Sequence, residues 1–172
     1  MTTAPATVSL FTASNTPALT NLNDGSPLEV GVKFSSSVAG QVTALKFYRS
    51  PNDTGPDLLD LWSSTGTKLA SATFTNTAAS GWQTVNLTTP VAIAANTTYV
   101  ASYHTTGAYV VTEPYFTAGV TSGVLTAPSS ASAGGNGVYA YGGTNSAGLF
   151  PTNTFNTSNY WADVVFQPQL TG

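Results

Sequence analysis

Hydrophobic and polar residues alternate in short runs along most of the chain, and Gly, Pro, Asn and Ser separate the runs. In the run Leu28–Phe34 every even-numbered residue is apolar, whereas the odd-numbered residues are Glu29, Gly31 and Lys33. Successive side chains of a β-strand point to opposite faces, so this run predicts a strand with one buried face and one face in water.

The same alternation predicts ten strands. They are Thr7–Thr12, Leu28–Phe34, Gln41–Arg49, Leu58–Ser63, Lys68–Thr75, Trp82–Leu87, Thr98–His104, Ala108–Thr112, Gly137–Tyr141 and Tyr160–Phe166. Residues that favour helices are scarce, with three Lys, one Arg, two Glu and one Met, whereas Thr and Ser number 29 and 18. Short strands between turn residues are typical of an antiparallel sandwich or barrel, and we predict an all-β, jelly-roll-like antiparallel β-sandwich.

Two turn signals refine this prediction. Ser64–Gly66 separates two predicted strands, Leu58–Ser63 and Lys68–Thr75, and therefore predicts a hairpin in which Gly66 has a positive φ. Pro90 has no backbone N–H to donate, so it marks an edge strand or the start of a strand.

The length of 172 residues fits one domain with its own core. We expect a single domain over residues 1–172, with a core from about residue 7 to residue 167. Between residues 119 and 159 the alternation is lost, and Ser129–Gly137 has the composition of a flexible loop. We therefore expect a long loop-rich segment there, and loops of that length are usually functional or mobile.

Charged residues are few, and nine of the eleven lie between Asp24 and Lys68. The net charge is −3, and four basic residues are too few to bind nucleic acid or an anionic membrane surface. Only Glu113 and Asp163 follow Lys68, and His104 is the only histidine. So little acid–base chemistry is available that we expect the protein not to be an enzyme.

Other features of the composition concern location. No apolar run reaches the roughly 18–20 residues of a membrane helix, so we expect no membrane insertion. Residues Met1–Pro5 lack the basic and apolar parts of a signal peptide, which suggests a mature or excised module. Cys is absent, which excludes disulfides and thiolate metal sites. Low charge with abundant Thr, Ser, Asn and Gly favours a secreted, extracellular protein, and we expect the isolated domain to be a monomer.

Seven segments, in this order, resemble a known family. They are Leu28–Phe34, Val42–Tyr48, Leu61–Ala70 (Leu-Trp-Ser-Ser-Thr-Gly-Thr-Lys-Leu-Ala), Ser80–Val85, Thr98–His104, Gly135–Tyr139 and Asn159–Phe166 (Asn-Tyr-Trp-Ala-Asp-Val-Val-Phe). From about Leu10 to Phe166 the chain resembles a bacterial secreted module known as domain of unknown function 4082. The resemblance implies a non-catalytic β-sandwich appended to large extracellular proteins, often beside polysaccharide-active or adhesive domains, and it implies no particular ligand.

The chain departs from that family at one place. The family often has a Gly-Thr-His-Thr-Gly-like stretch before the Leu-Trp segment, but residues 54–60 of this chain contain no His. The resemblance therefore does not extend to any function of that imidazole.

Aromatic and polar side chains on the predicted wet faces form the first candidate site. Aromatic rings that stack on sugars, with polar groups that bind the hydroxyls, make a workable saccharide site. The predicted ligand-binding residues are Tyr48, Trp62, Tyr103, His104, Trp161 and Asp163. The alternative is that Trp62 and Trp161 belong to the core and that Lys46–Asp163 or Lys33–Glu29 is a structural ion pair.

The acidic loop around Gly55 is the second candidate. Its predicted metal ligands are Asn52, Asp53, Asp57 and Asp60, which offer the oxygen atoms that a structural Ca²⁺ prefers. Their spacing does not match an EF-hand. The alternative is that they form Asx turns in a surface loop.

Catalytic alternatives are weaker. His104, Asp163 and a Ser would supply the residue types of a triad, and Glu113 with Asp163 would supply two carboxylates, but no motif brings these groups together. Lys33 or Lys46 could also form an intramolecular amide with an Asn or Asp inside the sandwich.

Together these patterns predict a non-catalytic, extracellular bacterial module that binds carbohydrate, either a polysaccharide or a cell-surface glycan, as part of a larger protein. The alternative function is that of a structural or adhesive spacer. Exposure of the aromatic rings distinguishes the two: exposed rings in a groove favour binding, whereas rings that are all packed inside favour the spacer.

Overall fold

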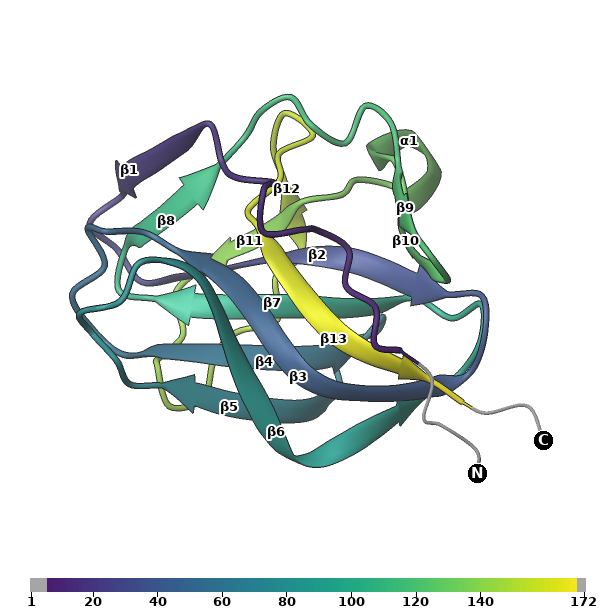
Figure 1. Ribbon diagram of the computed structural model, residues 1–172. Helices are drawn as coiled ribbons and strands as arrows, with labels where there is room; N and C mark the ends of the chain where they lie inside the picture. The colour runs from purple at the N-terminus through teal and green to yellow at the C-terminus, as the bar shows by residue number, and fades with distance from the viewer. Residues whose placement is uncertain (1–5, 170–172) are drawn as a thin grey trace.

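Two antiparallel β-sheets packed face to face form the body of the protein (Figure 1). The computed structural model describes residues 6–169; Met1–Pro5, on which the signal-peptide expectation depends, lie outside the described residues. Strands account for 51% of the structure, and the prediction of an all-β antiparallel sandwich is confirmed.

The larger sheet has the order β12-β11-β2-β7-β4-β5, and β10 pairs with both β2 and β9. Its strands are β2 (Leu28–Ser36), β4 (Asp57–Ser63), β5 (Lys68–Phe74), β7 (Tyr99–Thr105), β9 (Val120–Ser122), β10 (Leu125–Ala127), β11 (Val138–Tyr141) and β12 (Asn153–Thr154). The smaller sheet has the order β13-β3-β6, with β3 (Gly40–Arg49), β6 (Gly81–Ile93) and β13 (Ala162–Pro168). A separate pair, β1 (Leu19–Asn23) and β8 (Ala108–Val111), closes one end.

Both turn predictions are confirmed. Strands β4 and β5 form the predicted hairpin, and Gly66 has a φ of +96°. Strand β6 is an edge strand, and the four residues Leu87–Pro90 bulge opposite Thr43, because Val42 pairs with Val91 and Ala44 pairs with Asn86. Pro90 thus lies where no strand partner needs its missing N–H.

The prediction of a strand at Thr7–Thr12 is wrong, and several short elements were not predicted. Residue Val8 makes a single bridge to Phe166, and the residues after it leave the sheet. The loop-rich segment 119–159 contains β9, β10, β12 and the four-residue helix α1 (Ser130–Ala133) besides the predicted β11. These elements are two to four residues long, which is too short for a periodic signal.

Side chains rather than strand pairing hold part of that segment. The amide of Asn136 is fully buried; its Oδ1 accepts a hydrogen bond from Lys33 N at 2.9 Å, and its Nδ2 donates to the carbonyl of Lys33 at 3.1 Å. Asn136 therefore gives β2 the two hydrogen bonds that a neighbouring strand would give.

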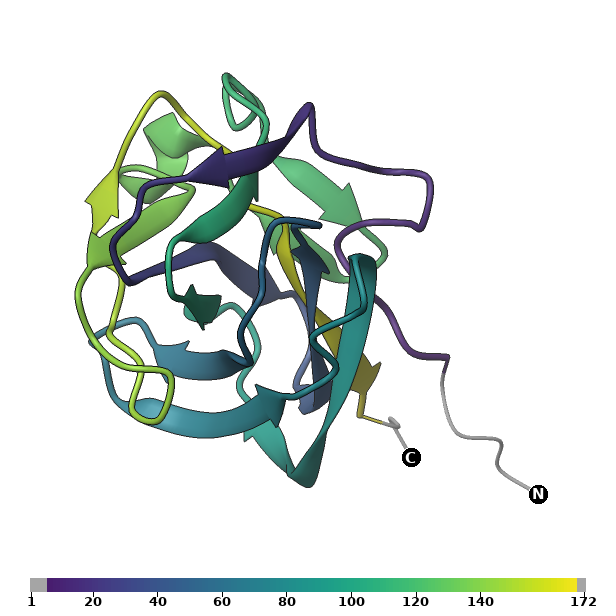
Figure 2. The same cartoon turned by 90° about the vertical axis from the view of Figure 1, so that its left-hand side faces the viewer.

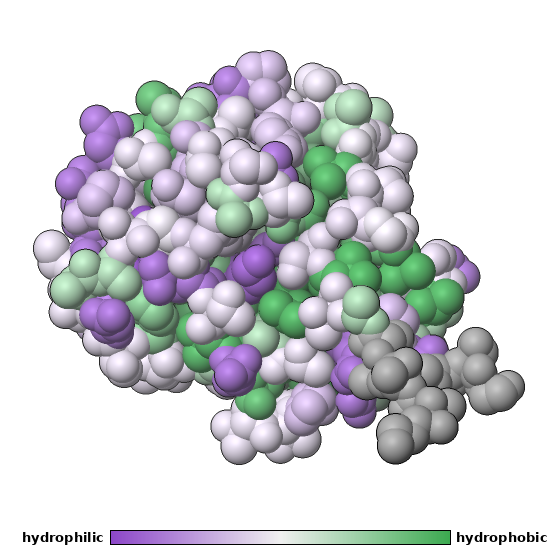
Figure 3. Space-filling view, viewed as in Figure 1, coloured by the Kyte–Doolittle hydropathy of each residue, from purple (hydrophilic) through white to green (hydrophobic). Residues whose placement is uncertain are grey.

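The core lies between the two sheets. It includes the even-numbered residues of β2, as predicted, together with rings such as Phe47, Tyr103 and Phe166. None of the helices in the described residues is long and apolar enough to cross a membrane. The face in Figure 3 is mostly near neutral in hydropathy, because Thr, Ser and Gly supply much of it.

The prediction of a wet outer face on β2 is wrong. Every residue of β7 and the first six residues of β4 are buried, and Glu29 on the outer side of β2 has no exposed surface. The segment 142–151, which we call the strap, covers this face; in Figure 2 it runs down beside β4 and β5. Strand alternation does not reveal a cover contributed by a distant loop.

A second cover lies over β13. The backbone N–H groups of Leu10 and Phe11 donate to the two carboxylate oxygens of Asp163 at 2.8 and 2.9 Å, and the rings of Phe11 and Trp161 lie 5.0 Å apart. Burial raises the pKa of Asp163 to about 6, although the three backbone N–H groups that bind it, the third from Val164, act in the opposite direction.

We predict that Asp163→Asn lowers the free energy of unfolding by about 1–3 kcal/mol, because the amide places an NH₂ donor where a backbone N–H needs an acceptor. Urea denaturation of the variant measures the loss. Asp24→Asn is the matched control, since it removes a carboxylate at an exposed position. Equal losses in both variants would contradict the role of Asp163.

Candidate functional site

The six residues predicted to bind ligand do not share a surface. Trp62 and His104 lie on the outer face of the larger sheet beneath the strap, and Tyr103 points into the core, where its hydroxyl donates to the carbonyl of Tyr160. Trp161 and Asp163 lie beneath residues 10 and 11, as described above, and all five of these side chains are at most 6% exposed. The sixth, Tyr48, is half-buried against Trp82.

These positions decide between the two interpretations of the tryptophans. Trp62 and Trp161 belong to hydrophobic clusters, so the alternative that both are core residues is confirmed. The proposed ion pairs of Lys46 and Lys33 do not form: within the described part of the chain, salt bridges join Arg49 to two aspartates and Lys68 to a third. The Nζ of Lys46 instead lies over the ring of Trp82, and that of Lys33 donates to the carbonyl of Ala133.

The four predicted calcium ligands do not converge on one point. Arg49, which is 1% exposed, lies between Asp53 and Asp57, with N–O distances of 3.4 and 2.9 Å. It also donates to the carbonyls of Gly55, Thr77 and Ala79. A guanidinium group therefore already occupies the position that a cation bound by these two carboxylates would take.

The other two predicted ligands are directed elsewhere. The amide of Asn52 donates to the carbonyl of Asn21, and Asp60 lies beneath the strap. No cluster of three or more metal-binding side chains occurs among residues 6–169. The residues present do not fit a calcium ion at this loop.

Because the residues around Gly55 do not fit a calcium ion, we expect that EDTA leaves the melting temperature unchanged. We also expect that Arg49→Lys lowers the free energy of unfolding by about 3–5 kcal/mol, because an ammonium cannot bridge both carboxylates and the carbonyls. Thermal unfolding with and without chelator, and urea denaturation of the variant, measure the two effects. A melting temperature lowered by EDTA and restored by Ca²⁺ would restore the calcium site.

Beneath the strap, the outer face of the larger sheet holds a buried polar cluster. The indole N–H of Trp62 donates to Ser102 Oγ at 2.8 Å, and Ser102 in turn donates to Glu29. The strap closes this chain of bonds, since Leu149 N donates to the other oxygen of Glu29 at 2.8 Å. Gly148 has a φ of +69°, and a Cβ atom there would collide with Asp60.

Two carboxyl groups share this dry space. Desolvation, together with the neighbouring Asp60, raises the pKa of Glu29 to about 9, and desolvation also raises the pKa of Asp60. Lys68, whose Nζ lies 3.5 Å from Asp60 Oδ1, acts in the opposite direction on Asp60. Two buried carboxylates this close cannot both ionise readily, so Glu29 keeps its proton at neutral pH.

His104 fastens the strap to β7. Its Nε2 faces the carbonyl of Gly142 at 2.7 Å, and its Nδ1 faces the side-chain oxygen of Asn145, whose Nδ2 donates to the carbonyl of Pro56. Both ring nitrogens of His104 are therefore used to hold the strap against the sheet.

This cluster lacks the geometry of a triad. A nucleophile must be hydrogen-bonded to its base, but Ser102 bonds to Glu29 and Trp62, while His104 bonds to the strap. Asp163 lies on the other sheet, and Glu113 is exposed. The contacts of these residues are those of a structural network.

We predict that the protein loses stability as pH rises from about 4.5 to about 9, since the unfolded Glu29 carboxyl ionises near 4.5 whereas the folded one keeps its proton. Glu29→Gln keeps the neutral shape and should raise the free energy of unfolding at pH 8 by at least about 1 kcal/mol, with little effect at pH 4. Urea denaturation across this range, with Glu113→Gln as an exposed control, tests the effect. Parallel stability curves for wild type and Glu29→Gln would refute it.

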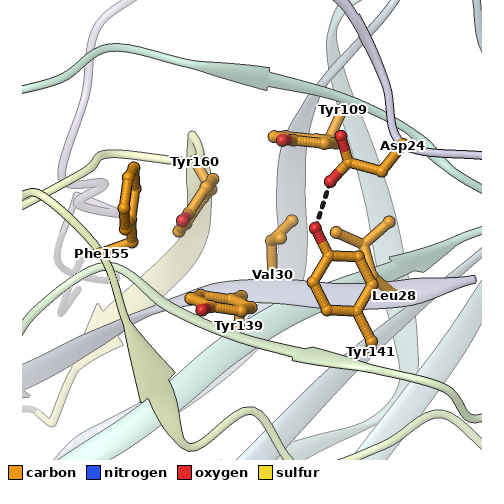
Figure 4. Close-up of a pocket in the computed structure, with 8 residues that line it drawn as sticks. All are labelled: Asp24, Leu28, Val30, Tyr109, Tyr139, Tyr141, Phe155 and Tyr160. Atoms are coloured by element: carbon orange, nitrogen blue, oxygen red, sulfur yellow. Dashed lines mark hydrogen bonds between the residues drawn. The ribbon is translucent and has the colours of Figure 1, made fainter. Parts of the chain in front are cut away.

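A pocket at the open edge of the sandwich brings aromatic rings to the surface. It has a volume of about 330 Å³ and is lined by Asp24, Leu28, Val30, Tyr109, Tyr139, Tyr141, Phe155 and Tyr160 (Figure 4). Tyr141 and Phe155 are 52% and 54% exposed, and they are two of the four large hydrophobic side chains exposed in the described residues. We call this site the tyrosine pocket.

Strand geometry aligns the walls of the pocket. Tyr139 and Tyr141 are two residues apart on β11, so both point to the side of the sheet where Val30 and Leu28, their partners on β2, also point. Tyr109 comes from β8, and Tyr160 lies two residues before the start of β13. The floor of the pocket is thus a continuation of the core that the smaller sheet leaves uncovered.

Asp24 brings a negative charge to the rim. It follows β1, and its Oδ2 accepts a hydrogen bond from the hydroxyl of Tyr141 (Figure 4). This hydrogen bond is the main cause that raises the pKa of Tyr141 to about 12, and burial raises the pKa of Tyr160 to about 12. The hydroxyls of Tyr141 and Tyr160 are therefore neutral at physiological pH.

The sequence predictions missed every residue of this pocket as a ligand-binding residue. One signal was present: Tyr139 and Tyr141 alternate in a predicted strand next to the glycine-rich segment. Nothing in the sequence, however, brings Asp24, Tyr109 and Phe155 to the same place, because β1 pairs with β8 and β11 pairs with β2 across more than 80 residues in each case.

The fold and the pocket define a β-sandwich module with one aromatic surface site. The chain matches the family described as "Domain of unknown function (DUF4082)" over residues 14–162, most of its length, and therefore belongs to that family. The matched range contains all eight residues that line the tyrosine pocket. A comparison with curated proteins finds no match.

Proposed function

We propose that the protein is a non-catalytic extracellular module that binds carbohydrate, a polysaccharide or a cell-surface glycan, through the tyrosine pocket. It would act as a monomeric unit within a larger secreted or cell-surface bacterial protein. The observation that carries the proposal is that Tyr141 and Phe155, both more than half exposed, line one cavity together with three further tyrosines.

The chemistry of the pocket suits a sugar. A sugar ring has apolar C–H faces that stack on aromatic rings and hydroxyl groups that need donors and acceptors. The tyrosine pocket offers both, because the rings carry hydroxyls at their edges and Asp24 supplies a carboxylate. Its volume of about 330 Å³ is at the small end of the roughly 300–1,000 Å³ typical of ligand pockets, which suits one or two sugar units.

The composition supports an extracellular setting. Surfaces rich in Thr and Ser with few charges are consistent with a secreted protein, as is the absence of Cys in a bacterial one. The alternative function is a structural or adhesive spacer, which the burial of the central strands on both faces favours, because it leaves no open sheet face for a ligand.

We predict that Tyr141→Ala and Phe155→Ala each weaken glycan binding by about tenfold or more, because each removes an exposed stacking surface worth about 1–2 kcal/mol. A glycan array followed by calorimetry on the best ligand measures the effect. Leu69→Ala on β5 is the matched control, since it truncates an exposed apolar side chain outside the pocket.

Two outcomes would count against this site. Binding that survives in both pocket variants would place the ligand elsewhere on the molecule. No binding to any glycan by the wild-type protein would favour the spacer.

A further inference from the structure

The aromatic side chains of the tyrosine pocket form walls around one space. The ring planes of Tyr139 and Tyr141 meet at 76°, those of Tyr139 and Tyr160 at 69°, and those of Tyr109 and Tyr160 at 64°, with centroids 5.8 to 6.4 Å apart. Figure 4 shows these rings and Phe155 around the cavity above Val30. Walls at steep angles present several π-faces and edges to a single occupant.

The charge at the tyrosine pocket is negative. Asp24 is the only charged residue among the eight that line it, and none of the eight is Lys, Arg or His. Glu113 adds a second negative charge close enough to act on Tyr160. The π-faces of aromatic rings also attract cations. The rings and the carboxylate therefore both favour a positively charged ligand.

These features narrow the chemical class of sugar that the tyrosine pocket could bind. An acidic sugar would face Asp24 with no basic partner to balance its charge. A protonated amine would gain from the ring faces and from the carboxylate of Asp24, whose Oδ2 accepts the hydroxyl of Tyr141. A quaternary ammonium would use the rings but has no N–H to donate to the carboxylate and the tyrosine hydroxyls.

We infer that the tyrosine pocket selects a sugar residue that bears a free, protonated amine. This inference rests on the proposed carbohydrate-binding function and specifies the ligand class of the same site. Asp24 is then the residue that determines charge selectivity, and Tyr141 and Phe155 supply the stacking surface.

The test uses a matched pair of probes, a glucosamine tetramer and its fully N-acetylated counterpart, which share a sugar skeleton and differ in charge. Calorimetry at pH 6 is expected to show binding of the amine form at least about tenfold tighter than that of the acetylated form. Affinity for the amine form should fall as NaCl is added, because salt screens an exposed ion pair.

Two variants distinguish a direct contact between the amine and Asp24 from a general attraction by the negative charge of the protein. Asp24→Asn keeps an oxygen acceptor for the Tyr141 hydroxyl and removes the charge, so it should weaken binding of the amine tetramer by about tenfold without affecting the acetylated one. Glu113→Gln removes one negative charge from a residue that does not line the pocket, and it should have a much smaller effect. Unchanged circular dichroism and melting temperature establish that both variants fold.

The outcomes distinguish this inference from the proposed function. Equal binding of both tetramers, abolished by Tyr141→Ala and unaffected by Asp24→Asn, overturns amine selection but leaves carbohydrate binding intact. Tetramethylammonium that binds as tightly as the glucosamine tetramer overturns the inference, because it shows a cation site that needs neither an N–H group nor a sugar. No binding of either tetramer overturns the inference, and the glycan array then decides whether the proposed function survives.

Discussion

The structure depends on one constraint, the burial of β2, β7 and β4 on both faces. On one side the smaller sheet supplies the core; on the other the strap covers Glu29, Asp60, Ser102 and His104. Backbone and side-chain polar groups that lose water in this way need partners. Hydrogen bonds on the covered face run from Trp62 through Ser102 to Glu29 and from His104 to the strap, whereas Asp60 is held there by its salt bridge to Lys68.

That closure has an electrostatic consequence. Two buried carboxyl groups side by side hold a proton far above the pH at which an exposed Glu or Asp loses it, so the folded protein contains the neutral form of Glu29. Residues that would suit acid–base chemistry in an open cleft serve here to attach a loop to a sheet. The same holds for Arg49, whose guanidinium joins two aspartates and three carbonyls in the space where a metal ion was predicted.

The proposed binding site lies at the edge of the sandwich as a result. The larger sheet extends beyond the smaller one at β11, and there the core continues to the surface as the tyrosine pocket, partly roofed by β1 and β8. The kind of site, aromatic rings with a few polar groups, was predicted from the sequence, but its residues were not. Trp62 and Trp161 are the most conspicuous rings in the sequence, and both are core residues, whereas Tyr141 and Phe155 lie in the segment that had been expected to be loop-rich.

The sequence by itself determined the class of fold, the inner face of β2, the β4–β5 hairpin with Gly66 and the edge position of Pro90, because each follows from local alternation or from the backbone limits of one residue. Which faces of the β-sheets are exposed to solvent depends on tertiary structure. Burial of Glu29 depends on Gly148 and Leu149, about 120 residues away, and the tyrosine pocket depends on strands β1, β8, β11 and β12 meeting at one end. Contacts between such distant segments leave no periodic signal along the chain, so they are visible only in the folded molecule.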